Sequence, residues 1–169
     1  MSRVFGADEQ SDVQVDVVRW VRLAGLVLDE ERVPGEAELS VIFVDEQAIT
    51  DLNERFLGGK GPTDVLAFPM DDDVVLGGRQ PDQGGRGPGS PTEPGDPPTL
   101  LGDVVVCPEM AERQAREQAG SLDDEVALLV VHGVLHLLNY DHAEPQESDA
   151  MKRRERELLT KFRELEQGG

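Results

Sequence analysis

The chain has 169 residues, 35 of them acidic and 16 basic, which gives a formal net charge of −19 at pH 7. That length suits a single domain over residues 1–169 with a sizeable core, and such an acidic balance argues against tight binding of naked nucleic acid through phosphate contacts. No apolar run has the roughly 18 residues of a membrane helix, and the sequence shows no charged-then-apolar signal pattern. Cys107 is the single cysteine, so no disulfide can form within the chain. We therefore expect a cytoplasmic protein with no membrane contact.

The first half of the chain alternates helical and extended patterns. Apolar residues at helical spacing predict amphipathic helices, and β-branched runs predict strands. Asp45 can cap the second helix, from which Ile49 and Phe56 would face the core. The expected elements are a helix over residues 13–28, a strand over 38–44, a helix over 46–57 and a strand over 65–68.

Residues 71–99 have a different composition. Three aspartates open the segment, and the stretch from Gly77 to Pro98 is rich in glycine, proline and serine with almost no large apolar side chain. Such a segment cannot bury a core, so we predict a flexible surface loop between two strands that are neighbours in the sheet. The aspartates are better explained as an acidic loop start than as a site for a hard cation.

The second half of the chain predicts one strand followed by helices. Pro108 can open the first of these helices, and Ser121 can cap the next. The expected elements are a strand over 101–107 and helices over 108–119, 122–138 and 146–165, the last with Met151, Leu158, Phe162 and Leu165 buried. This order predicts an α+β domain, a small mixed β-sheet with helices packed mainly on one face.

The last helix also holds six of the sixteen basic residues. We interpret it as a solvated face with ion pairs four residues apart, such as Glu157 with Lys161, rather than as an RNA-binding face. The acidic total predicts weak intrinsic RNA affinity, with a protein or ribosomal partner supplying the rest. The six residues are Lys152, Arg153, Arg154, Arg156, Lys161 and Arg163.

All three histidines of the chain lie within one stretch of eleven residues. His132 and His136 are one helical turn apart, so their imidazoles share a face and can converge on one ion. His142 follows six residues later, and Asn139 in a left-handed conformation would end the helix and let the chain turn back. This pattern predicts a three-imidazole metal site at the C-terminal end of a central helix. Zinc is the expected ion, nickel or copper are alternatives, and a fourth position stays open for water.

One position in the motif argues against peptide hydrolysis. Zinc peptidases with this histidine spacing carry a glutamate directly after the first histidine, where it acts as general base. Gly133 occupies that position here. A peptidase mechanism would therefore lack its proton acceptor, and the sequence assigns no other general base.

The histidine motif and two further segments resemble the signatures of the YbeY family, bacterial endoribonucleases of ribosomal RNA maturation. The segments are Gly61–Pro69 and Gly102–Glu109, and the resemblance covers residues 36–160. It implies an α+β fold and a zinc-dependent, single-strand-specific endoribonuclease with His132, His136 and His142 as ligands. It further implies a role in maturation of the 16S rRNA 3′ end and in ribosome quality control. The implied partners are ribosomal RNA, the small ribosomal subunit, and a ribosomal or GTPase protein.

The matched segments also supply candidates for a substrate groove, namely Thr63, Asp64 and Asp103, for which turn and cap chemistry is the alternative role. Many members of the family carry an arginine after an aromatic residue before the Pro-Thr-Asp segment, and that arginine is thought important for activity. Leu57 follows Phe56 at this place. Leu57 and the acidic balance favour a second hypothesis, a non-catalytic ribosome assembly factor with a structural zinc. A zinc peptidase is the third.

Overall fold

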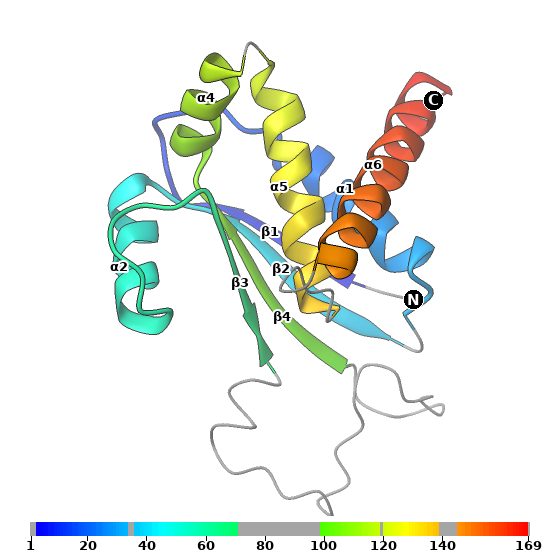
Figure 1. Ribbon diagram of the computed structural model, residues 1–169, viewed down its shortest axis with the longest axis horizontal. Helices are drawn as coiled ribbons and strands as arrows, with labels where there is room; N and C mark the ends of the chain where they lie inside the picture. Colours follow the sequence, from blue (N-terminus) through cyan, green and yellow to red (C-terminus); the bar gives the residue numbers. More distant parts are fainter. Residues whose placement is uncertain (1–2, 34–35, 71–98, 119, 139–144, 169) are drawn as a thin grey trace, which may run out of the picture.

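The computed structural model describes residues 3–33, 36–70, 99–118, 120–138 and 145–168. This part of the chain forms four strands and five helices, which confirms the α+β prediction (Figure 1). In chain order the elements are β1 (Arg3–Asp8), α1 (Val17–Glu30), β2 (Ala37–Phe43), α2 (Glu46–Phe56), β3 (Val65–Pro69), β4 (Thr99–Val106), α4 (Pro108–Glu117), α5 (Leu122–Leu137) and α6 (Pro145–Gly168).

The four strands form one mixed sheet in the order β1-β2-β4-β3. β2 pairs in parallel with both β1 and β4, and β3 pairs antiparallel with β4. The long segment between β3 and β4 therefore joins two adjacent strands, as predicted. Residues 71–98 of that segment lie outside the described residues.

Helices α1 and α5 pack on one face of the sheet, and α2 packs on part of the other. Alternation along the strands sends Val41 and Val104 into the core beneath α1 and α5. Leu66 and Val105 point to the opposite face, where they pack with Ile49 of α2. In Figure 1, α2 is separated from the group formed by α1, α5 and α6. Helix α5 contacts α1, α4 and α6 as well as β3 and β4, so it occupies the centre of the fold.

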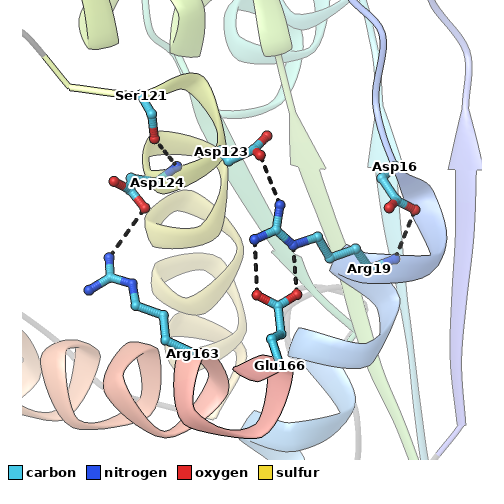
Figure 2. Close-up of polar contacts among 7 residues, drawn as sticks. All are labelled: Asp16, Arg19, Ser121, Asp123, Asp124, Arg163 and Glu166. Carbon is cyan, nitrogen blue, oxygen red and sulfur yellow. Dashed lines mark hydrogen bonds and ion pairs between the residues drawn. The ribbon is translucent and has the colours of Figure 1, made fainter. Parts of the chain in front are cut away.

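The N-terminal end of α5 is fixed by a polar network that joins three helices (Figure 2). The Ser121 hydroxyl caps the helix by accepting a hydrogen bond from the Asp124 amide at 3.0 Å, as predicted. Arg19 of α1 donates Nη1 to Asp123 at 2.9 Å and binds Glu166 of α6 through two nitrogens at 2.7 and 2.9 Å. Arg163 reaches Asp124 at 3.3 Å. The two-nitrogen contact fixes orientation as well as distance, so α1, α5 and α6 are held in register.

Several sequence expectations differ from the structure. Strand β1 was not predicted, because its six residues carry little apolar character and pair only at the edge of the sheet. Helix α1 begins after Asp16, whose side chain accepts a hydrogen bond from the Arg19 amide, and not at residue 13. Phe56, the last residue of α2, is 63% exposed rather than in the core, and its ring meets that of Phe68 edge-on.

Two sequence predictions for the last helix are wrong, namely the burial of Leu165 and the pairing of Lys161 with Glu157. Leu165 is 55% exposed and lines an open groove between α1 and α6 instead of the core. Lys161 pairs with Glu30 of α1 rather than with Glu157. Arg154 also bonds α1, through Glu31 at 3.1 Å. Half of the six basic residues thus engage acidic groups on other helices, since Arg163 pairs with Asp124. The interpretation as an ion-paired face is therefore supported, with different partners.

None of the helices in the described part of the chain is both long enough and apolar enough to cross a bilayer.

Candidate metal and substrate site

The site is built on the C-terminal half of α5. His132 and His136 lie one turn apart, with ring centroids 4.6 Å apart and ring planes at 76°. Their Nε2 atoms face each other at 3.0 Å. Two nitrogens bound to one tetrahedral zinc at about 2.0–2.1 Å lie about 3.3 Å apart. The two imidazoles are therefore arranged as two ligands of a single ion would be.

A buried carboxylate holds the first of these histidines. Glu155 of α6 is 6% exposed, and its Oε2 lies 2.5 Å from the His132 Nδ1 atom. Because Nδ1 is occupied in this way, Nε2 is the nitrogen left to face His136 and the solvent.

The histidine pair opens into a cavity along the edge strand β3. The cavity has a volume of about 380 Å³. Its walls are the strand on one side and the helix on the other, and its lining residues are Leu57, Asp64, Val65, Leu66, Ala67, Pro69, His132, Gly133 and His136. Both Nε2 atoms are thus accessible to an ion and to a substrate group.

The chemistry of the histidine pair fits a transition metal. Imidazole nitrogen is a good ligand for zinc, copper and nickel, and a pair held at one face needs little rearrangement to bind. Within the described ranges, no three His, Cys, Asp or Glu side chains form a group that could hold an ion. His142 and Asn139, the predicted third ligand and helix stop, lie outside those ranges.

The three groove candidates separate in space. Asp64 lines the cavity, and its Oδ1 accepts a hydrogen bond from the Val65 amide at 2.8 Å. Thr63 contacts the same oxygen at 3.4 Å but does not line the cavity. Asp103 follows the alternation of Val105 to the other face of the sheet, where it lines a separate cavity of about 90 Å³. The structure therefore brings Asp64 to the histidines and places Asp103 elsewhere.

Burial raises the pKa of two groups in this region, the Glu125 carboxyl and the Cys107 thiol. Glu125, in the first turn of α5, is 9% exposed. Burial raises its pKa above the ordinary value, and the nearby Asp64 carboxylate raises it further. Cys107 is fully buried at the end of β4, where burial raises the thiol pKa. A buried thiol of raised pKa is a core residue and not a metal ligand.

Gly133 allows α5 to approach the sheet. A β-carbon at this position would lie 2.5 Å from Cγ1 of Val104 on β4. The helix therefore packs too closely for a side chain here, and the glutamate of a zinc peptidase would not fit without displacing the helix. Packing and chemistry together exclude that base at residue 133.

Sequence reasoning missed Glu155 as part of the site. Its signal was present in the helical pattern, because residue 155 falls on the buried stripe that Met151, Leu158 and Phe162 define. A carboxylate in such a stripe is expected to have a specific partner.

The chain is similar to known proteins along most of its length. The model of the family "Endoribonuclease YbeY" matches residues 6–163. A protein named Endoribonuclease YbeY from Salinispora tropica is 46% identical to this chain, and the match covers 96% of this chain and 97% of the relative. A protein of the same name from Frankia casuarinae is also 46% identical, and the match covers 94% of this chain and 74% of that relative. The solution structure of TM1509 from Thermotoga maritima superposes with a TM-score of 0.54 at 26% identity, covering 97% of this chain and 93% of that one. The chain belongs to the YbeY endoribonuclease family.

Proposed function

We propose that the protein is a zinc-dependent endoribonuclease that cuts single-stranded regions of ribosomal RNA. The observation that carries the proposal is the pair of Nε2 atoms, 3.0 Å apart, at the mouth of a cavity beside an edge strand. Family membership supplies the substrate class, since the matching relatives carry the name endoribonuclease.

Zinc would be held by His132, His136 and His142. When bound, the ion supplies a Lewis acid for a phosphate oxygen and lowers the pKa of a coordinated water to about 7. The side chains of this protein orient the ligands and shape the space for the substrate. The cavity has the size of pockets that enclose one small ligand. That size favours an extended single strand, which can insert one nucleotide, and disfavours a base-paired duplex.

The proposed cellular role is maturation of the 16S rRNA 3′ end and ribosome quality control in the cytoplasm. A net charge of −19 makes tight binding of isolated RNA unfavourable. The small ribosomal subunit, together with a ribosomal or GTPase protein, would then position the RNA. Binding of naked RNA that is both tight and strongly salt-dependent would contradict this division of labour.

Metal removal tests the proposal directly. Purified protein is expected to contain about one zinc per chain and to cut a single-stranded oligoribonucleotide that carries an rRNA 3′ end. A chelator should abolish cleavage, and added zinc should restore it. Zinc is measured by mass spectrometry, and cleavage is followed on gels with a base-paired version of the same oligonucleotide as control. The proposal fails if zinc-loaded protein leaves the single strand intact while a control ribonuclease degrades it, or if cleavage persists without metal.

Leu57 brings no positive charge to the cavity, so we expect this chain to bind RNA phosphate weakly. Its side chain is 51% exposed and lines the cavity beside His132 and His136. Leu57→Arg would place a guanidinium there, and charge-assisted contacts to phosphate are strong. We expect kcat/KM for single-stranded RNA to rise about tenfold, mainly through a lower KM, and to depend more steeply on salt.

Leu100→Arg provides the matched control for this variant. Leu100 is 49% exposed and lines the small cavity on the other side of the sheet, so the substitution adds the same charge away from the histidines. A similar gain in both variants would assign the effect to net charge, and no gain in Leu57→Arg would show that no phosphate passes residue 57.

The non-catalytic alternative rests on the same leucine and on the acidic surface. If the protein only assembles ribosomes, variants that lose zinc would leave rRNA processing in cells unchanged. A peptidase is disfavoured by the close packing at Gly133, and incubation with unstructured peptides would reveal any such activity.

A further inference from the structure

Helix α6 carries a carboxylate in the middle of its apolar stripe. Met151, Leu158 and Phe162 are 1%, 1% and 6% exposed, and Glu155, at 6%, lies between them on the same face. Burying an unpaired carboxylate is costly, so such a residue is retained where a partner offsets the cost. The partner is His132, 23 residues earlier on α5, at 2.5 Å.

This contact determines which imidazole nitrogen is available. An Nδ1–H that donates to the Glu155 carboxylate makes Nε2 the nitrogen that carries the lone pair, which is the form that a metal ligand needs. That Nε2 lies 3.0 Å from the Nε2 of His136 and opens to the cavity. The contact also limits rotation of the His132 ring, whose side chain is 29% exposed. One carboxylate thus sets both the tautomer and the direction of the ring.

We propose that Glu155 is the positioning residue of the metal site, which makes α6 a structural part of that site. It accepts a hydrogen bond from His132 Nδ1 and holds Nε2 in the direction that an ion requires. Carboxylates in this position generally raise the basicity of the ligand and strengthen metal binding about 10- to 100-fold. The proposal rests on the proposed function, in that the ion is taken to be zinc.

Glu155→Leu tests the proposal through zinc affinity. Leucine matches its apolar neighbours but leaves the His132 Nδ1 without its partner, so the metal-free variant is expected to unfold at a somewhat lower temperature than the wild type. Its Kd for zinc, measured by competition with a chromogenic chelator, should rise about 10- to 100-fold. Glu155→Gln keeps an oxygen that can accept from Nδ1, so its Kd should rise less. Because glutamine has nearly the shape of glutamate, this variant also keeps the test valid if the leucine variant folds poorly.

Glu157→Leu is the matched control. It removes the same charge from the same helix, but its side chain is 57% exposed and pairs only loosely with Arg154, at 3.7 Å. Its Kd for zinc should equal that of the wild type. Equal weakening at residues 155 and 157 would assign the effect to overall charge and overturn the proposal, as would an unchanged Kd in Glu155→Leu.

A readout without metal separates this inference from the proposed function. Nitrogen-15 spectra of the metal-free wild type, at a pH where the ring is neutral, should show His132 in the Nδ1–H form. Glu155→Leu should shift the ring toward the Nε2–H form. An Nε2–H ring in the wild type would overturn the positioning role even if zinc binds, whereas a protein that binds no zinc but shows the Nδ1–H ring would lose the proposed function and keep the contact.

Discussion

His136→Ala is expected to lower RNA cleavage by more than about 100-fold. Loss of a residue that only hydrogen-bonds to a metal ligand already lowers metal affinity or activity about 10- to 100-fold, and loss of a ligand itself should cost more. The reason is geometric. The Nε2 of His136 lies 3.0 Å from that of His132, and one imidazole cannot hold an ion in the geometry that the pair provides. Zinc content should fall in parallel, and both quantities are measured on the same preparation.

Asp123→Ala is the control on the same helix. Asp123 is in the first turn of α5, 13 residues before His136 and therefore about 20 Å away along the helix axis. Its loss weakens a surface contact with Arg19 but should leave zinc content and cleavage unchanged. The double variant His132→Ala, His136→Ala should be no worse than His136→Ala alone, because the ligands act as one unit.

In cells, His136→Ala distinguishes the two ribosomal hypotheses, the metal-dependent enzyme and the non-catalytic assembly factor. An enzyme that needs its metal should leave unprocessed rRNA 3′ ends when His136 is lost. A non-catalytic assembly factor, in which zinc is only structural, should process rRNA normally with His136→Ala, provided that the variant folds and accumulates to wild-type levels. Normal rRNA processing would show that this chain acts by docking on the ribosome and not by catalysis.

The histidine pair was predictable because its geometry is local. Spacing of four residues fixes two side chains on one face of any α-helix, and Ser121 and the apolar run identified that helix. Glu155 required the packing of α6 on α5, which brings together residues 23 positions apart. The sequence pattern marked residue 155 as buried but carried no information about its partner.

Two of the acidic residues in the matched segments show a second limit. Asp64 and Asp103 were both candidates for one substrate groove, yet only Asp64 lines the cavity of the histidines. The side chains of a strand alternate between two faces, and a shift by one residue reverses them all. Pairing of β2 with β4 contains such an irregularity near Leu39, which sequence alone does not reveal.

Gly102→Ala is expected to destabilise the protein by about 3 kcal/mol or more, because a strained backbone and a close backbone contact each cost about 1–3 kcal/mol. Gly102 has a φ of +135°, a conformation that side chains rarely adopt. An added β-carbon would lie 2.1 Å from the carbonyl oxygen of Phe68 and 3.0 Å from Cα of Pro69 on β3. Neither atom belongs to a movable side chain, so the strand itself would have to shift.

Thermal and urea unfolding measure this effect, with a Tm expected to fall by roughly 6–12 °C in a domain of this size. Gly25→Ala is the control, because a β-carbon at that position in α1 meets nothing within 4 Å. Alanine in a helix interior should raise stability by about 0.5–1 kcal/mol. Equal stability of the two variants would show that β3 yields to the added methyl group.

Displacement of β3 should also affect the site, because Val65 and Pro69 form the wall of the cavity opposite the histidines. Folded Gly102→Ala protein is therefore expected to bind zinc normally, since α5 holds the ligands, but to cut RNA with a raised KM. Loss of zinc together with activity would mean instead that β4 supports α5 through Val104 and Gly133. In either case, the glycine of the Gly-Asp segment is required by strand packing, and it affects catalysis only through the elements that β4 holds in place.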